Sequence, residues 1–424
     1  MKILLTGATG FIGSRVAAAL RRRGHQVVSV NRQPDPTDIS QIAGNFARDT
    51  DAAVWLPRLV GVDVVVNAVG IIRESGSQSF SALHIQGPRA LFDACVQAGV
   101  RKVIQISALG ADEAATSRYH VSKASADRYL QTLPLEWVVL RPSLVFGLGG
   151  ASTRLLTAVA SLPLVPLIGR GEQCVQPVHV DDLVELCVLS IESSAMDRLT
   201  IDVVGLQAYT MKDLLAELRS RLGLAAARFV SVPLGLVRLG AAVCGVTPGS
   251  LLDRETLGML ERGNTADAAG FAAALGRPPR APILFVSEET SEAVLAWARE
   301  SWTTLLMRWS LAIVWIVTGL LSLGIYPVKA SLVLLGHLGL TGTPASVALY
   351  GAAGLDLLLG LGVLLFHRRR WLWKIQFGLV VSYSLAIAIA LPEYLLHPFG
   401  PVLKNVALLA MILVLHETDG RKSR

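Results

Sequence analysis

Short apolar runs alternate with helical stretches over the first 300 residues of this 424-residue chain. The apolar runs are continuous rather than alternating, which is typical of strands buried on both faces of a parallel sheet. They lie at 2–7, 26–32, 62–70, 102–110 and 137–147, and the helical stretches between them include 11–24, 81–99 and 122–133. Strands that alternate with helices in this way predict an α/β fold built on a doubly wound parallel sheet.

Charged residues almost disappear beyond residue 305. Four apolar runs follow, two without any charge and two with one each, Asp356 and Lys404; they lie at 309–326, 345–366, 375–391 and 398–415. A helix needs about 20 apolar residues to cross a hydrocarbon core of about 30 Å. The pattern therefore predicts a four-helix transmembrane bundle over residues 305–424, after a soluble domain over residues 1–300. Two weaker stretches predict a core or membrane-surface helix at 229–246 and an interfacial segment at 327–344.

The two charges inside these runs are predicted to form an ion pair between helices, because an isolated charge within the bilayer is costly. The alternative is that Lys404 extends to the outer surface while Asp356 is protonated.

Positive charge is concentrated between the second and third runs, in "HRRRWLWK" at 367–374. Positive loops stay on the cytoplasmic side of a membrane, and tryptophans such as Trp371 and Trp373 favour its interface. The same rule places Arg308 and the tail "GRKSR" on that side. These segments predict a multi-pass protein of the inner (cytoplasmic) membrane, with the N-terminal domain and the C-terminus in the cytoplasm.

The composition agrees with a membrane protein, since 52% of the residues are hydrophobic and the mean hydropathy is +0.51. The net charge of +7 comes from scattered basic residues without a basic stripe, so nucleic acid is not an expected partner. The cysteines show no metal-ligand spacing, so no metal is predicted, and they are expected to be small buried side chains in a reducing compartment; they are Cys95, Cys174, Cys187 and Cys244. The N-terminus "MKILLTGATG" does not have the pattern of a signal peptide.

A glycine-rich loop, "TGATGFIG", directly follows the first predicted strand and opens a helix. Its first glycine permits a tight turn, its second lets the backbone approach a pyrophosphate, and its third lets helix and strand pack closely. The helix N-terminus then faces the phosphates. This context predicts a Rossmann-like dinucleotide site formed by Gly7, Thr9, Gly10, Phe11, Ile12 and Gly13.

The second predicted strand ends in "SVNRQ", without the acidic residue that would bond the ribose 2′-hydroxyl of NAD. Asn31 and Arg32 stand there instead. An arginine can bind the 2′-phosphate of NADP, so the sequence favours NADP(H) over NAD(H). Arg15 is a second candidate for that phosphate.

A candidate catalytic set lies in "SRYHVSKASAD", where Tyr119 and Lys123 are four residues apart and share one helix face. The lysine ammonium is expected to lower the tyrosine pKa and to bond the cofactor ribose, so that the tyrosine exchanges a proton while hydride moves. Ser107, at the end of the strand "KVIQIS", would stabilise the same substrate oxygen. Tyr129 has no lysine four residues on and is the weaker tyrosine.

Several of these motifs together resemble the atypical or extended branch of the short-chain dehydrogenase/reductase superfamily, which includes NAD-dependent epimerases and dehydratases; they are "TGATGFIG", "NAVG", "ISALGAD", "YHVSK" and "LRPSLVFG". The resemblance covers residues 1–300 and is closest in appearance to the NADPH-binding accessory subunit of respiratory complex I. It implies catalytic roles for Ser107, Tyr119 and Lys123, and cofactor contacts for Asn67, Ala68, Val69, Gly70, Lys123 and Pro142.

The resemblance also implies a small substrate subdomain, mainly at 165–300, with "QPVHVDDLVEL" at 176–186 facing the substrate pocket. The chain departs from the family pattern at "LHIQG", where many relatives have Asn and this chain has His84.

The last 120 residues are similar to DoxX-like four-helix membrane domains, which implies a membrane redox or thiol-stress context and a membrane redox partner. We therefore expect a membrane-anchored NAD(P)-dependent oxidoreductase or epimerase-like enzyme that acts on a small, lipophilic substrate. Two alternatives remain open. One is a non-catalytic NADPH-binding sensor or scaffold of a membrane redox complex, which the substitution at His84 favours. The other is a membrane transporter under cofactor control.

Overall fold

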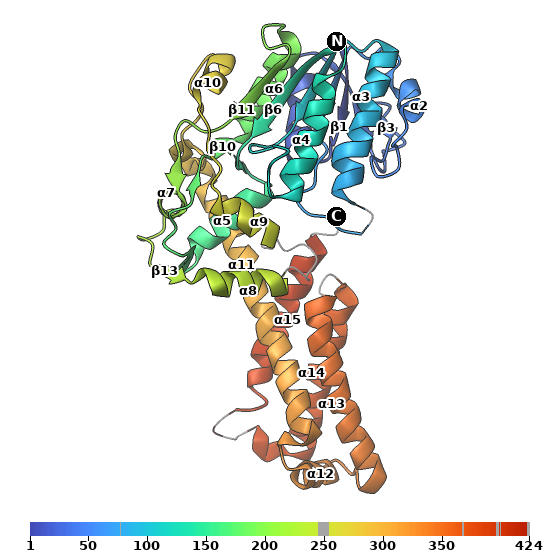
Figure 1. Ribbon diagram of the computed structural model, residues 1–424. Helices are drawn as coiled ribbons and strands as arrows, with labels where there is room; N and C mark the ends of the chain where they lie inside the picture. Colours follow the sequence, from blue (N-terminus) through green and yellow to red (C-terminus); the bar gives the residue numbers. More distant parts are fainter. Residues whose placement is uncertain (77, 245–253, 367–368, 396–397, 399, 422–424) are drawn as a thin grey trace. The chain divides into compact units, whose positions relative to one another are not determined.

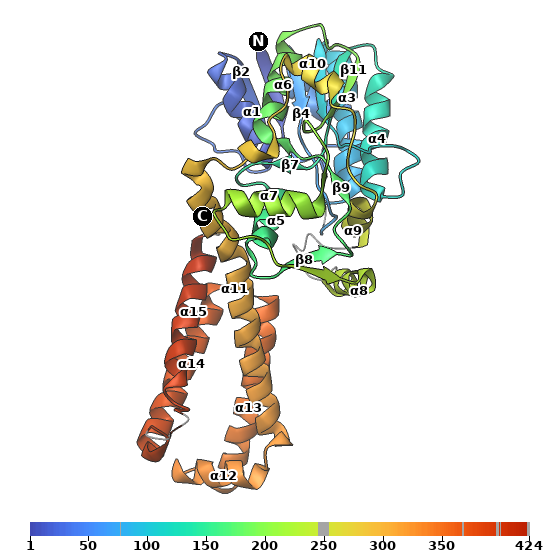
Figure 2. The ribbon, with the colours of Figure 1, turned by 90° about the vertical axis from the view of Figure 1, so that its left-hand side faces the viewer.

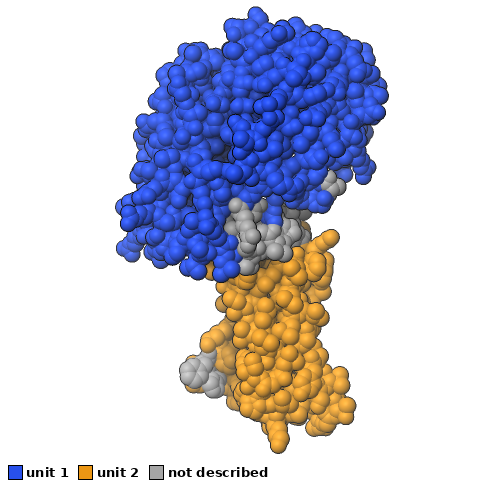
Figure 3. Space-filling view, in the orientation of Figure 1, with its two compact units in different colours: residues 1–298 blue, residues 299–424 orange. Residues whose placement is uncertain are grey.

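The computed structural model describes residues 1–76, 78–244, 254–366, 369–395, 398 and 400–421. Residues 367–368 of the basic loop, the end of the C-terminal tail and residues 245–246 of the weaker apolar stretch lie outside the described residues. The chain forms two compact units, residues 1–298 (unit 1) and residues 299–424 (unit 2), which are coloured separately in Figure 3.

Unit 1 is built on a seven-stranded sheet in which every neighbouring pair is parallel (Figure 1). The strand order is β11-β6-β5-β4-β1-β2-β3, so the chain reverses direction across the sheet next to β1. The strands are β1 (Lys2–Thr6), β2 (Gln26–Asn31), β3 (Gln41–Ala43), β4 (Val64–Asn67), β5 (Lys102–Ile106), β6 (Glu136–Pro142) and β11 (Leu199–Val203). This arrangement confirms the predicted doubly wound α/β fold.

Helices cover both faces of the sheet because consecutive strand residues point to opposite sides. On one face Ile3 and Leu5 pack against α1 (Phe11–Arg22) and α6 (Val180–Glu192). On the other face Leu4 belongs to a second core, with α2 (Ala52–Trp55), α3 (Gly87–Ala98) and α4 (Arg118–Gln131). The continuous apolar runs of the sequence are the result of this two-sided burial.

The rest of unit 1 consists of short strand pairs and helices around a third core that includes Phe146, Leu215 and Phe285. The pairs are β7 (Val145–Phe146) with β10 (Val178–His179), β8 (Val165–Ile168) with β13 (Phe229–Val232), and β9 (Cys174–Val175) with β12 (Tyr209–Thr210). The helices are α5 (Ala151–Ser161), α7 (Met211–Arg221), α8 (Leu234–Cys244), α9 (Arg254–Glu261) and α10 (Ala269–Leu275). The described part of α8 exposes Leu236 and Leu239, so these two side chains are not part of a core.

Unit 2 is helical, and α11 (Glu288–Leu320) leads into it (Figure 2). The other elements are η4 (Leu321–Ile325), α12 (Val328–His337), α13 (Gly342–Leu365), α14 (Arg370–Ala390) and α15 (Lys404–Arg421). Three helical segments are long and apolar enough to cross a membrane: Glu288–Ile325, Gly342–Leu365 and Arg370–Ala390. They cover the first three predicted spans except for the last residue of each.

The fourth predicted span, 398–415, is helical only from Lys404. Helix α15 carries Glu417, Asp419 and Arg421 near its other end, so its uncharged part is 12 residues or about 18 Å long, short of a hydrocarbon core of about 30 Å. The described residues therefore hold three candidate spans, and a fourth crossing stays a prediction.

Three segments that the sequence assigned to one side of the membrane meet at one end of unit 2. Arg308 of α11 forms an ion pair with Asp419 of α15, and the indole Nε1 of Trp373 in α14 donates to Asp419 Oδ2 at 2.9 Å. Helix α15 therefore returns to the end of the unit at which α14 begins.

Two expectations about individual side chains were wrong. Asp356 and Lys404 do not pair: the side chain of Lys404 is exposed, and Asp356 Oδ1 is buried without a hydrogen-bond partner among the described residues. Cys95 and Cys187 are buried as expected, but Cys174 is exposed because it begins the short strand β9 outside the cores. The side chain of Cys244 is outside the described part.

Candidate cofactor-binding and catalytic site

The glycine loop joins the carboxyl end of β1 to the first turn of α1. Gly7 has a φ of +72°, and a Cβ on it would lie 2.7 Å from the carbonyl carbon of Ala68. A Cβ on Gly13 would lie 2.1 Å from the Gly7 carbonyl oxygen. These approaches explain why side chains are excluded at both positions. Gly10 is the N-cap of α1 and no side chain caps this end, so the first backbone N–H groups of the helix are open to an anion.

Asn67, at the end of β4, uses its side chain to hold neighbouring strands. Its Oδ1 accepts from the Thr6 hydroxyl at 2.7 Å, and its Nδ2 donates to Gln105 Oε1 at 2.8 Å. The amide of Val69 also donates to Asn67 Oδ1, at 3.3 Å. The side chain of Asn67 therefore fixes the course of the loop 68–70 rather than pointing a free donor outward. Pro142 ends β6 in the same row of carboxyl ends, and its carbonyl accepts from Leu109 N at 2.9 Å.

Helix α4 carries the candidate catalytic pair, and Ser117 caps its N-terminus. Tyr119 and Lys123 lie one turn apart on it. The Lys123 ammonium donates to the carbonyls of Val69 at 3.2 Å and Ile106 at 3.1 Å, which follow β4 and end β5. A Cβ on Gly70 would lie 3.0 Å from Lys123 Nζ. The structure thus brings the lysine to the loop that also touches Gly7.

Ser107 is buried at the end of β5, and its hydroxyl donates to Asp127 Oδ2 at 2.6 Å. Asp127 lies one further turn along α4 from Lys123, and it also contacts Arg141 Nε of β6 at 3.4 Å. In this arrangement the Ser107 hydroxyl bonds a carboxylate inside the protein. Asp127 was missed by the sequence analysis, although its spacing of four residues from Lys123 places it on the same helix face.

His84 links the loop after β4 to the catalytic helix. Its Nε2 accepts from the Ile71 amide at 3.0 Å, so Nδ1 carries the proton. Nδ1 then donates to the Ser122 hydroxyl at 2.9 Å, which donates to the Tyr119 carbonyl at 2.7 Å. Burial, and next the charge of Lys123, lower the pKa of His84 to about 2. This histidine is a neutral link at neutral pH.

The protonation of the candidate catalytic pair is set by burial. Burial, with the Asp127 charge as the second cause, raises the pKa of Tyr119 to about 12. Burial lowers the pKa of Lys123 to about 8, against the opposing effect of Asp127. The expectation that Lys123 lowers the tyrosine pKa was therefore wrong for this state, because loss of hydration and the Asp127 charge both act in the opposite direction. Tyr119 is protonated at neutral pH.

The end of β2 presents two polar residues of different exposure. Asn31 is buried and donates to Gln41 Oε1 at 2.7 Å, while its own Oδ1 has no partner among the described residues. Arg32 is exposed. Arg15, the second candidate, is held by the carbonyls of Phe11 and Leu148 and stacks over the Phe11 ring at 4.5 Å.

Glu255 of α9 was also missed by the sequence analysis. Its Oε1 accepts from the Tyr119 amide at 2.9 Å and from the Ser117 hydroxyl at 3.1 Å. A carboxylate at a helix N-terminus is stabilising. No local sequence signal could have identified it, since 136 residues separate it from Tyr119.

The segment "QPVHVDDLVEL" holds a buried carboxylate. Asp182 accepts from the Arg277 guanidinium at 2.7 Å and from the Arg280 backbone amide at 2.8 Å. It also forms an ion pair with the Arg280 guanidinium at 3.0 Å, and it thereby fixes the loop that follows α10. His179 caps α6 beside the ring of Phe285, with the ring centroids 5.5 Å apart. Whether this segment faces substrate stays a prediction.

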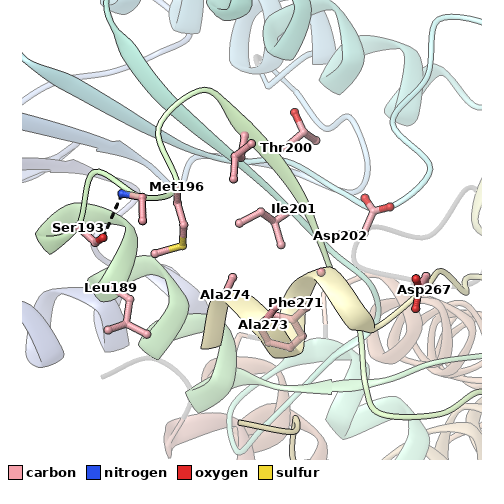
Figure 4. A pocket seen from close by; sticks show the side chains of 13 residues that line it. Leu189, Ser193, Met196, Thr200, Ile201, Asp202, Asp267, Phe271, Ala273 and Ala274 are labelled. Atoms are coloured by element: carbon pink, nitrogen blue, oxygen red, sulfur yellow. Dashed lines mark hydrogen bonds between the residues drawn. The ribbon is translucent and has the colours of Figure 1, made fainter. Parts of the chain in front are cut away.

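A pocket of about 700 Å³ lies elsewhere, along the edge strand β11 and between α6 and α10 (Figure 4). Its walls include Met196, Ile201, Asp202 and Phe271. None of the glycine-loop or α4 residues lines it, so it is separate from the candidate site.

Comparison with known proteins agrees with this geometry. The NAD dependent epimerase/dehydratase family matches residues 3–203, and the DoxX-like family matches residues 312–413. The N-terminal part of the chain is therefore similar to the NAD-dependent epimerase/dehydratase family, and the part after it is similar to DoxX-like membrane domains.

Two relatives and one solved structure show the range of similar proteins. Ceramide reductase of Caulobacter vibrioides is 26% identical over 250 residues, 57% of this chain and 77% of that protein. The mouse (Mus musculus) mitochondrial NADH dehydrogenase (ubiquinone) 1 alpha subcomplex subunit 9 is 31% identical over 192 residues. That match covers 42% of this chain and 49% of the relative, so the chain spans about half of its length. UDP-glucuronic acid 4-epimerase from Bacillus cereus, solved with UDP-glucuronic acid and NAD, has a TM-score of 0.52 and 20% identity over 71% of this chain and 99% of that one, which shows the shared fold.

Proposed function

We propose that this protein is a membrane-anchored, NADP(H)-preferring oxidoreductase that reduces the carbonyl group of a lipophilic substrate, with Tyr119 as the proton donor. The observation that carries the proposal is the position of Lys123. Its ammonium is hydrogen-bonded at the carboxyl ends of β4 and β5, one helical turn from Tyr119 and against the loop that contacts Gly7. Ligands of doubly wound sheets bind at this edge, where the strand order reverses.

The residues around this edge fit a dinucleotide. The close backbone approaches at Gly7 and Gly13 hold the loop tightly against the first turn of α1, and the uncapped N-terminus of α1 can receive a pyrophosphate. A bound nicotinamide would supply the hydride.

Tyr119 is suited to the reductive direction. With a pKa near 12, its phenol holds a proton at neutral pH and gives it to the carbonyl oxygen as the carbonyl carbon receives the hydride. The product is an alcohol, and the tyrosinate left behind is stabilised by the Lys123 cation until it is reprotonated from solvent. Ser107, Asp127 and Arg141 hold the helix and strands around this pair.

The cofactor preference rests on Arg32. It is exposed directly after β2 and can bind a 2′-phosphate, and the buried Oδ1 of Asn31 can accept from a ribose hydroxyl. Neither of the two residues at the end of β2 is acidic.

The class of substrate follows from the membrane helices and the relatives. Three apolar helical segments give unit 2 a lipid environment, and one relative is named for a ceramide. We propose a long-chain lipid ketone as the substrate and the inner membrane as the location, with unit 1 and the C-terminus in the cytoplasm.

The test uses the full-length protein in detergent with NADPH and a keto-ceramide. We expect Tyr119→Phe to reduce NADPH oxidation by about 100-fold or more while NADPH binding, measured by calorimetry, stays within a few-fold. Tyr129→Phe is the matched control on the same helix, because Tyr129 bonds Asp93 of α3 and should leave turnover unchanged. Arg32→Ala should narrow the preference for NADPH over NADH. Turnover that survives Tyr119→Phe would refute the assigned role.

A non-catalytic, NADPH-binding sensor or scaffold of a membrane redox complex is the second candidate. It is favoured by the engagement of the Ser107 hydroxyl with Asp127 and by the relative that is a subunit of NADH dehydrogenase. NADPH binding without turnover on any lipid ketone, together with a cellular function that survives Tyr119→Phe, would support it.

A further inference from the structure

Polar side chains lie at successive levels inside the apolar helices of unit 2. At one end are Arg308, Trp373 and Asp419. Further along, Trp315 Nε1 of α11 donates to Gln376 Oε1 of α14 at 2.7 Å, and both residues are buried. Near the start of α15, Asn405 Nδ2 donates to the Ser384 hydroxyl of α14 at 2.8 Å.

Asp356 of α13 lies between these levels. Unlike the other polar side chains, it has a carboxyl oxygen without a partner in the part of the chain that the structure describes. It is 7% exposed, and its Oδ1 has no hydrogen-bond partner in the described residues. The Thr318 hydroxyl of α11 lies beside its carboxyl group and donates to the backbone carbonyls of Val314 and Trp315. Tyr383 of α14 lies close enough to interact electrostatically with Asp356.

The helix backbones leave little room around this carboxyl group. A Cβ on Gly319 would lie 2.9 Å from the Ala353 carbonyl oxygen, and a Cβ on Gly360 would lie 2.6 Å from the Ile316 side chain. Ala353 and Gly360 are about one turn on either side of Asp356. Helices α11 and α13 therefore approach closely above and below it.

An ionised carboxylate in such a place is costly without a cationic partner, and ionisable groups inside membrane helices are usually functional. Asp419, equally buried at 6% exposure, has Arg308 as its partner. Among the described residues no ion pair joins Asp356 to a cation, since Lys404 is exposed and Arg308 pairs with Asp419 at the end of the unit. The least costly state of Asp356 in an apolar surrounding is the neutral acid.

We propose that Asp356 is a proton-binding site of the helical unit, which takes up and releases a proton within the membrane span. The hydroxyl groups of Thr318 and Tyr383 are the neighbouring groups that can exchange this proton. The site requires no hydride chemistry, so it stands or fails independently of the function proposed for unit 1.

The test is labelling of the full-length protein in liposomes with N,N′-dicyclohexylcarbodiimide, which reacts with protonated carboxyl groups in apolar surroundings. Peptide mass spectrometry should find the adduct on Asp356, with labelling that falls at least several-fold between pH 6 and pH 9. Asp419 is the internal control, since an ion-paired carboxylate should stay unlabelled. Asp356→Asn should remove the adduct, although the assignment by peptide mass does not depend on that variant.

Two outcomes would overturn the proposal. No labelling of Asp356 at any pH would show that the group is ionised or inaccessible to a proton. Labelling that is the same at pH 6 and pH 9 would show a permanently protonated acid with a structural role, hydrogen-bonded within the helix bundle.

Discussion

Lys123 illustrates at the scale of one residue how this site balances stability against function. It is 4% exposed, and its ammonium has two carbonyl partners and Asp127 nearby. The Asp127 charge only partly compensates the lost hydration of the ammonium, so the pKa of Lys123 falls to about 8 from an ordinary 10.5. The folded protein therefore carries an energetic cost at neutral pH in order to keep a positive charge beside Tyr119.

This cost predicts a pH-dependent stability difference between the natural protein and Lys123→Met. Below pH 8 the lysine is charged in both the folded and unfolded states, and the cost is fully present. Between pH 8 and 10.5 the folded state loses the proton first, so the unfolded state binds more protons and the free energy of unfolding rises with pH. The natural protein should gain stability relative to Lys123→Met over this window, by up to about 1.4 kcal/mol per pH unit.

Thermal unfolding of both full-length proteins in the same detergent, from pH 7 to pH 10, measures this difference. Subtracting the two curves removes the contribution of all groups that they share. A difference that stays constant with pH would show that Lys123 does not titrate in this range.

At the scale of elements, helix α4 carries several of the candidate site residues. Its N-terminus is capped by Ser117 and by Glu255 from α9, and one of its faces carries Tyr119, Lys123 and Asp127. The π-helix η2 (Ser81–Gln86) brings His84 against it. Such helices with an extra residue per turn often occur at functional sites. The candidate catalytic pair is thus held from three separate segments.

Helices α11 and α13 of unit 2 allow a direct test of their close packing. Gly360→Ala would place a methyl group 2.6 Å from the Ile316 side chain and 3.1 Å from the Ala312 carbonyl oxygen. We expect this overpacking to destabilise the protein by about 1–3 kcal/mol, measured by thermal unfolding in detergent.

The matched control is Gly354→Ala in the same helix, where a Cβ would meet nothing within 4 Å. Because alanine has the higher helix propensity, this change should leave stability unchanged or increase it by up to about 1 kcal/mol. Equal effects of the two substitutions would contradict the packing of α11 on α13.

At the scale of the whole molecule, the topology follows from the end of unit 2 at which Arg308, Trp373 and Asp419 meet. We expect this end to face the cytoplasm, because positive segments adjoin it. In a bacterial host, a reporter that is active only outside the cytoplasm should be silent when fused after residue 370 or residue 421. It should be active when fused near residue 395, at the other end of α14.

A cytoplasmic reporter at the same positions should give the reciprocal pattern. If the external reporter is active after residue 421 and silent near residue 395, the orientation is the opposite of the one expected. If it is active at both sites, α15 does not return through the membrane.

The sequence by itself determined the order of the two domains, the parallel sheet, the glycine loop and three membrane helices. Each of these depends on local signals: apolar runs of a given length, glycine spacing, and the density of charge. The positions of Tyr119 and Lys123 on one helix face also follow from a spacing of four residues.

Only the tertiary structure decided what the side chains contact. Ser107 meets Asp127, His84 joins Ile71 to Ser122, and Glu255 reaches Tyr119 across 136 residues of chain. The direction of the Tyr119 pKa shift and the absence of an Asp356–Lys404 pair were decided there too. Burial and long-range contacts set these properties, and both arise from packing of segments that are distant in the sequence, which a local pattern does not encode.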